Sequence, residues 1–225
     1  MPKLLVLRFP GSNCDEDARY ALERLGADVD FVWHTDTALP DAGGVLIPGG
    51  FSHGDYLRSG ALAALSPVME AVRTFAARGG PVLGICNGFQ VLTEAGLLPG
   101  ALARNVGLAF VCATVEVEVG SADTPLLAGL EPGARLRLPV AHHDGRYVAA
   151  EADLQALEAR RGVALRYLPE TDPNGSSHRI AGVVNERGNV LGMMPHPERA
   201  TEAILGGVDG VPLLRAFARA AGAAS

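Results

Sequence analysis

Residues 81–92 read PVLGICNGFQVL, in which an apolar run passes through a single cysteine into a helical pattern. The apolar run over 81–85 predicts a buried strand, and the residues after the cysteine predict a helix. A side chain at such a sharp strand-to-helix turn is held exposed and strained, as in a nucleophile elbow with cysteine in place of serine. Gly84 and Gly88 let the turn pack closely. Cys86 is therefore the candidate nucleophile.

The position of Cys86 at the start of a helix suits thiol chemistry. A helix N-terminus favours a negative charge and lowers the pKa of a thiol, and the backbone N–H of Asn87 is free to hold an oxyanion. The alternative is a buried cysteine that acts as a small hydrophobe, which is the common role of a free cysteine. The flanking glycines favour the reactive role for Cys86. Cys14 and Cys112 lack that setting, and we expect both to be structural.

The pattern around this turn predicts an α/β fold. Buried strands are predicted at residues 3–8, 29–33, 44–48 and 81–85, with helices at 15–25 and 66–79 between them. This alternation favours a mostly parallel central sheet with helices on both faces. The second half predicts strands at 111–119, 135–141, 163–167, 180–185 and 190–194, a loop at 171–178 and a closing helix at 210–221. We interpret residues 1–225 as one domain.

Composition and charge exclude several classes of function. The net charge of −6 argues against a nucleic-acid partner. The single lysine, Lys3, precedes the first strand and is badly placed for a P-loop or a Schiff base. No apolar stretch is long enough to cross a bilayer, and the N-terminus lacks the pattern of a signal peptide. Three separated cysteines suit a reduced, cytoplasmic setting.

A thiol nucleophile needs a base, and the base needs a group that orients it. His196 follows the predicted strand at 190–194, inside the sequence Pro195-His196-Pro197-Glu198. In extended backbone the side chains of His196 and Glu198 point the same way, so the carboxylate is placed to fix one tautomer of the imidazole. A surface turn that carries a polar pair is the alternative, and the spacing alone does not separate the two.

Two glycines and two histidines complete the set of candidates. Gly49 and Gly50 end the predicted strand at 44–48, where a second oxyanion donor is needed; an ordinary glycine turn is the alternative. His142 and His143 are adjacent in a predicted strand and so point to opposite faces, which is poor geometry for metal ligands. We expect a loop or interface role for them and no metal site in this chain.

With these residues in place, the chain resembles the class I (triad) glutamine amidotransferases. More narrowly, it resembles the glutaminase subunits of phosphoribosylformylglycinamidine synthases, a subfamily of purine biosynthesis. The cysteine and histidine motifs indicate the family, and the other matching segments indicate the subfamily. The matching segments are 9–15 (FPGSNCD), 48–58 (PGGFSHGDYLR), 84–90 (GICNGFQ), 97–102 (LLPGAL), 172–176 (DPNGS) and 192–199 (GMMPHPER).

The resemblance implies a flavodoxin-like amidotransferase fold and a role for each candidate. Cys86 would be the nucleophile, His196 the base and acid, and Glu198 the orienting carboxylate. The Gly49–Gly50 region and the N–H of Asn87 would form the oxyanion hole, and Gln90 would bind the α-amino and α-carboxylate groups of glutamine.

The resemblance also implies a partner. A γ-glutamyl thioester would release ammonia to a separate synthetase subunit, which would use ATP and magnesium to convert formylglycinamide ribonucleotide to its amidine. A small auxiliary subunit belongs to the same expectation. We expect no cofactor in this chain.

The chain departs from the subfamily at His53, where an aromatic residue is expected, and at 142–145, where HHDG stands in place of HGEG. The second departure bears on docking rather than on chemistry. The rival interpretations are a cysteine hydrolase or chaperone-like protein of the same architecture, a stand-alone γ-glutamyl hydrolase, and a binding subunit without catalysis. The 110 positions between Cys86 and His196 disfavour the first, and the intact triad disfavours the last.

Overall fold

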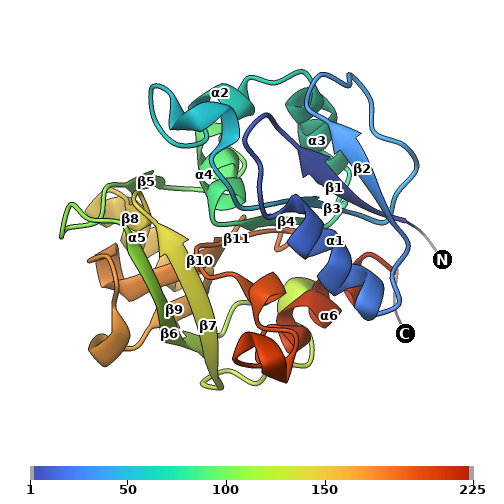
Figure 1. The fold of residues 1–225 in the computed structure, drawn as a ribbon. Coiled ribbons are helices and arrows are strands. Elements are labelled where there is room, and N and C mark those ends of the chain that lie inside the picture. Colours follow the sequence, from blue (N-terminus) through green and yellow to red (C-terminus); the bar gives the residue numbers. More distant parts are fainter. Residues whose placement is uncertain (1–2, 223–225) are drawn as a thin grey trace.

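The computed structural model describes residues 3–222 and has a nine-stranded sheet at its centre, in the order β2-β1-β3-β4-β11-β10-β9-β6-β7 (Figure 1). Its first half is parallel and consists of β2 (Val29–Trp33), β1 (Leu4–Arg8), β3 (Gly44–Ile47), β4 (Val82–Ile85) and β11 (Val190–Met193). These strands are almost continuously apolar because helices cover both of their faces.

The second half of the sheet is antiparallel. It consists of β10 (Ile180–Val184), β9 (Val163–Tyr167), β6 (Val111–Val119) and β7 (Arg135–His142). In the last part of β6, buried valines alternate with more exposed glutamates, as expected of a strand with one solvated face. A separate two-stranded sheet pairs β5 (Ala101–Ala103) with β8 (Arg146–Val148).

The helices divide between the two faces of the parallel strands. The α-helices of the described residues are α1 (Asp15–Arg24), α2 (Ala61–Ala64), α3 (Val68–Ala77), α4 (Asn87–Glu94), α5 (Glu151–Ala159) and α6 (Val211–Ala220). Helices α1 and α6 pack together on one side, and α2, α3 and α4 lie on the other (Figure 1). None of the helices within residues 3–222 combines the length and apolar character needed to cross a membrane.

The predicted α/β architecture is confirmed. The predicted strands are present with ends shifted by one residue at most, whereas β5, β8, α2 and α5 were not predicted. The loop expected at 171–178 contains two short 3-10 turns, Pro169–Thr171 and Ser177–Arg179, which overlap its ends. The described residues share one hydrophobic core; the single-domain interpretation of residues 1–225 stays a prediction.

The order of the strands places the candidate residues together. Strands β3, β4 and β11 are neighbours and run in the same direction. Carboxyl ends of parallel strands meet at one edge of a sheet, which is where ligands bind in open α/β folds. Gly49, Cys86 and His196 each follow one of these three strands within three residues. The sheet therefore brings together residues that are 110 positions apart in the sequence.

Candidate active site

Cys86 occupies the sharp turn between β4 and α4. Its backbone φ of 50° and ψ of −106° lie outside the usual regions for a residue other than glycine, and such a conformation costs about 1–3 kcal/mol. Gly84 and Gly88 have no room for a side chain, because a Cβ atom on Gly88 would lie 2.0 Å from the carbonyl oxygen of Ile47. The turn thus has the strained strand-to-helix geometry that the sequence predicts. The exposure expected of a side chain at such a turn is not found, because Cys86 is only 4% exposed.

His196 and Glu198 form a buried pair after β11. The Nδ1 atom of His196 lies 2.6 Å from Oε1 of Glu198, and the two residues are 1% and 2% exposed. Burial alone would lower the pKa of His196, but the charges of Glu198 and Cys86 outweigh it and raise that pKa well above its usual value. The carboxylate accepts a hydrogen bond from the Nδ1–H group and leaves Nε2 as the reactive nitrogen. The surface-turn alternative is excluded by this burial.

A cavity of about 170 Å³ joins the thiol to the imidazole. Cys86 and His196 both line it, together with Asn13, Cys14, Gly50, Phe51, Phe110, Ala141 and Arg199. Phe51 and Phe110 come from two different loops, and their ring centroids are 6.4 Å apart. The space therefore contains a nucleophile, a base and apolar walls, which is the set of parts that attack on an amide requires.

The oxyanion candidates differ in what they offer. Gly50 lines the cavity, and within residues 3–222 its backbone N–H and that of Asn87 donate no hydrogen bond to another residue. Gly49 has a packing role, because a Cβ there would lie 2.7 Å from Cε1 of His196 and 3.4 Å from Cβ of Cys86. The N–H of Gly49 likewise donates no hydrogen bond among the described residues, so all three N–H groups stay candidates for the oxyanion hole.

The amide side chains of Asn87 and Gln90 are already engaged. Asn87 accepts from the backbone N–H of Ser52 at 3.1 Å and donates to Gln90 at 2.8 Å. Gln90 in turn donates to the carbonyl oxygen of Asp144 at 2.7 Å and does not line the cavity. In this arrangement Gln90 ties α4 to the segment after β7, and its contact with glutamine stays a prediction.

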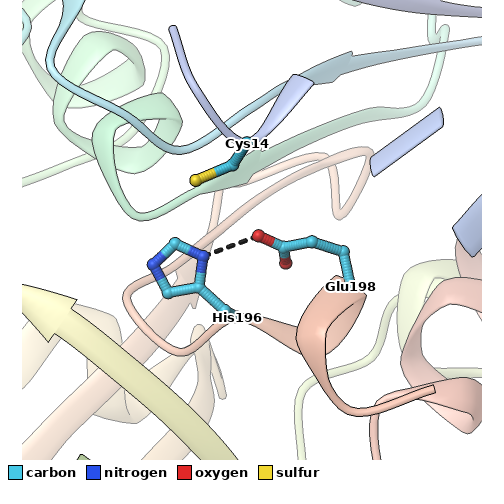
Figure 2. Close-up of side chains that lie close together, drawn as sticks. All are labelled: Cys14, His196 and Glu198. Carbon is cyan, nitrogen blue, oxygen red and sulfur yellow. Dashed lines mark hydrogen bonds and ion pairs between the residues drawn. The ribbon is translucent and has the colours of Figure 1, made fainter. Parts of the chain in front are cut away.

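Cys14 is the residue that sequence reasoning missed. We expected a structural role, yet Cys14 lines the same cavity and its Sγ accepts from Nη2 of Arg199 at 3.1 Å. Figure 2 shows its thiol directed toward the ring of His196, and burial raises its pKa. The sequence shows that Cys14 follows the first strand, but only the strand order, with β1 beside β3, brings it to the same edge of the sheet as Cys86. Cys112, expected to be structural as well, is exposed on β6.

The two adjacent histidines lie in different settings. His142 is the last residue of β7 and is buried, with Nδ1–H donating to Oδ1 of Asn105 at 3.1 Å. Burial, followed by the charge of His196, lowers the pKa of His142 to about 4. His143 is partly exposed and lies 3.3 Å from Asp144. His143 thus lies in a loop as expected, whereas His142 does not, because strand β7 continues one residue further than its apolar pattern. An interface role for either stays a prediction.

Comparison with known proteins adds independent findings. The family model of the CobB/CobQ-like glutamine amidotransferase domain matches residues 1–207. The phosphoribosylformylglycinamidine synthase subunit PurQ of one Thermus thermophilus strain is 57% identical over 95% of this chain and 96% of its own. The subunit of the same name from Cereibacter sphaeroides is 55% identical over 96% of both chains.

Solved structures agree with these sequence matches. A chain in the structure of PurLQS from Thermotoga maritima superposes with a TM-score of 0.89 at 45% identity, covering 97% of this chain and 98% of that one. Another glutamine amidotransferase from Thermotoga maritima has a TM-score of 0.63 at 17% identity, over 96% and 98% of the two chains, which shows a shared fold alone.

Proposed function

This chain belongs to the family of CobB/CobQ-like glutamine amidotransferase domains, and we propose that it is the glutaminase subunit of a phosphoribosylformylglycinamidine synthase. It hydrolyses glutamine to glutamate and ammonia, and the ammonia passes to a synthetase subunit. The observation that carries this proposal is the strained Cys86, which shares a cavity with His196, whose ring is hydrogen-bonded to the buried Glu198. Relatives over 50% identical across nearly the whole chain support the choice of synthase.

The geometry assigns each of these residues a role in one step of glutamine hydrolysis. The raised pKa of His196 favours transfer of the thiol proton from Cys86 to Nε2. The thiolate attacks the amide carbon of glutamine, and the N–H groups of Gly50 and Asn87 stabilise the oxyanion. His196 returns the proton to the departing ammonia, which leaves a γ-glutamyl thioester. Water, deprotonated by His196, then releases glutamate. Glu198 keeps Nδ1 protonated throughout.

The synthetase is the consumer of ammonia, and it holds the ATP and magnesium that the ligation needs. Lys3, the only lysine, supports this division of labour between the two subunits. Its Nζ donates a hydrogen bond to the surface carboxylate of Asp30 at 2.6 Å. We also place the chain in the cytoplasm, where its three free cysteines stay reduced.

The first test is covalent labelling with a γ-electrophilic glutamine analogue, 6-diazo-5-oxonorleucine. A single adduct on Cys86, blocked by excess glutamine, is the expected result by peptide mass spectrometry. Cys112→Ala, which removes an exposed thiol outside the cavity, is the matched control and keeps the adduct. An adduct on Cys14 alone, or none on Cys86 with the synthetase present, overturns the assignment of the nucleophile.

The second test separates the two half-reactions. In the complex with the synthetase, Cys86→Ala abolishes glutamine-dependent synthesis because the thioester cannot form, and ammonia-dependent synthesis continues. Amidine formation is measured with each nitrogen source. Loss of both activities in a correctly assembled complex contradicts the division of labour. Full glutaminase activity of the isolated chain would favour a stand-alone γ-glutamyl hydrolase.

A further inference from the structure

We propose that Cys14, His196 and Glu198 form a site for a thiophilic divalent transition ion, of which zinc is the type, and that the ion inhibits the enzyme. These residues come from two distant segments of the chain, one after β1 and one after β11. The proposed ion is an inhibitor and not a cofactor. The chemistry described above uses the thiol, the imidazole, the carboxylate and two backbone N–H groups.

The geometry of the three side chains is close to a ligand set. Each residue offers one ligand atom: Sγ of Cys14, a ring nitrogen of His196 and a carboxylate oxygen of Glu198. These three atoms lie within 4.8 Å of one another. Figure 2 shows the thiol and the carboxylate approaching the ring from different directions. Zinc bonds of about 2.3 Å to sulfur and about 2.0 Å to nitrogen place ligand atoms roughly 3.5 Å apart. Small side-chain rotations therefore close the site.

An unpartnered carboxylate oxygen points independently to a ligand. Among the described residues, Nε2 of His196 and Oε2 of Glu198 are buried and have no hydrogen-bond partner. Nε2 is the base of the glutamine chemistry and lies on the side of the ring away from Glu198, whereas Oε2 has no part in that chemistry. Buried polar atoms are nearly always satisfied, so the orphaned Oε2 calls for a ligand. An ion bound through Nδ1 of His196, in place of the proton there, would use this free capacity of Glu198.

Charge around the site favours a divalent cation once the thiol ionises. Binding replaces the Cys14 proton by the metal, so a zinc–thiolate bond forms and one proton is released. Glu198 supplies a second negative charge. Arg199 opposes the ion because its Nη2 lies 3.1 Å from Sγ of Cys14. The carboxylate of Asp17 offsets the positive charge of Arg199, because its Oδ2 lies 3.3 Å from Nε of Arg199. Sulfur and imidazole donors select zinc or cobalt over magnesium or calcium.

The nucleophile lies outside the ligand set. The Sγ atom of Cys86 is directed to the carbonyl oxygen of Ala141 at 3.7 Å. An ion on Nδ1 of His196 would break the hydrogen bond to Glu198 and move the ring proton to Nε2, which removes the base, while leaving the Cys86 thiol unligated. The inhibition rests on the proposed function, whereas the binding does not. A binding readout that involves no turnover therefore separates the two.

Cobalt(II) is the probe for binding, because thiolate coordination gives a charge-transfer absorption in the near ultraviolet. We expect the full-length chain to show this band and zinc to abolish it. Cys86→Ala and Cys112→Ala should keep the band, and Cys14→Ala should lose it, with affinity reduced about 100-fold or more. Circular dichroism confirms the fold of each variant. If Cys14→Ala fails to fold, Glu198→Gln provides the second test, with affinity reduced about tenfold or more.

The opposite pattern of variants overturns the site. A band that survives Cys14→Ala and disappears in Cys86→Ala shows that the ion binds the nucleophile, and the absence of any band shows that there is no thiolate site. Zinc inhibition of glutamine hydrolysis is then measured on wild type and Cys112→Ala, which should be equally sensitive. Binding without inhibition contradicts the second half of the proposal. A zinc-free enzyme without glutaminase activity contradicts the proposed function instead and leaves the spectral test intact.

Discussion

At the scale of single residues, the His196–Glu198 contact decides which nitrogen of the imidazole reacts. The carboxylate is buried, and its hydrogen bond to Nδ1 is 2.6 Å long. Nothing else among the described residues holds the ring in this tautomer. An amide in place of the carboxylate could donate to Nδ1 and so move the ring proton to Nε2, where it blocks base catalysis.

We therefore predict that Glu198→Gln lowers kcat for glutamine hydrolysis by roughly 10³- to 10⁴-fold. The substitution keeps the size of the side chain, so KM should change far less than kcat. Steady-state glutaminase assays with the synthetase present measure both. Glu202→Gln, on a partly exposed carboxylate nearby in the chain, is the matched control. A variant that retains more than a tenth of the activity would show that Glu198 does not orient the base.

His142 gives a residue-scale prediction about pH. Its pKa is about 4 in the folded protein, against 6.5 as the ordinary value. Between these values the unfolded chain binds a proton that the native state excludes, so the free energy of unfolding falls as the pH falls from 6.5 to 4. The shift corresponds to at most about 3 kcal/mol. Above pH 6.5 the residue is neutral in both states and contributes no pH dependence.

The variant His142→Gln should flatten this part of the stability profile, even if it lowers stability at pH 7. Urea unfolding at pH 7 and at pH 4.5 gives the two free energies for each protein. His143→Gln, on the partly exposed neighbour, serves as the matched control. An unchanged loss of stability in His142→Gln would assign the acid sensitivity to other groups.

At the scale of elements, the packing of α4 against β3 fixes the position of the nucleophile. Gly88 is the point of closest approach, since a Cβ there would meet the backbone of Ile47. We expect Gly88→Ala to lower the free energy of unfolding by about 1–3 kcal/mol or more, because backbone must move to admit the methyl group. The same movement displaces the turn at Cys86, so kcat should fall as well.

Gly107→Ala is the matched control for that substitution. A Cβ at Gly107 has no heavy atom within 4 Å, and the backbone there does not have positive φ. Chemical denaturation of both variants compares the two positions. Equal stability of the two variants would show that α4 can shift away from β3 at little cost.

The same elements show what the sequence could predict. The buried strands of the parallel half, the cysteine turn and the histidine motif all carry local signals. Strands β5 and β8 are three residues long and pair with each other across some 40 positions, so no period could develop. The place of β11 between β4 and β10 is a property of the assembled sheet. Cys14 was missed for the same reason, since its neighbours come from β3 and β11.

At the scale of the whole molecule, exposed apolar side chains gather in the two loops that carry Phe51 and Phe110, both lining the cavity. The set is Phe51, Tyr56, Leu57, Val106, Leu108 and Phe110. Clusters of exposed apolar residues are typical of interaction sites. A partner that receives ammonia must sit near the cavity, so we expect the synthetase to cover these loops.

Leu57→Asp should therefore weaken the complex with the synthetase at least tenfold, because a charge is buried on docking. The Leu57 side chain is 84% exposed, so the isolated fold should be unaffected. Ile204→Asp is the matched control, at 91% exposed in the distant 3-10 turn Ala203–Leu205. Dissociation constants from analytical ultracentrifugation compare the three proteins. If Ile204→Asp alone weakens the complex, the synthetase docks at the turn Ala203–Leu205 instead.

The place of β11 in the sheet also bears on how the protein is made. A ribosome synthesises Cys86 early, but the strand that delivers His196 begins only at Val190 of the 225 residues. That strand must enter between β4 and β10, both of which already exist by then. While the 110 residues from Cys86 to His196 are being made, the nascent chain therefore carries a thiol without its base. A product truncated before Val190 cannot hydrolyse glutamine, so incomplete synthesis releases no ammonia.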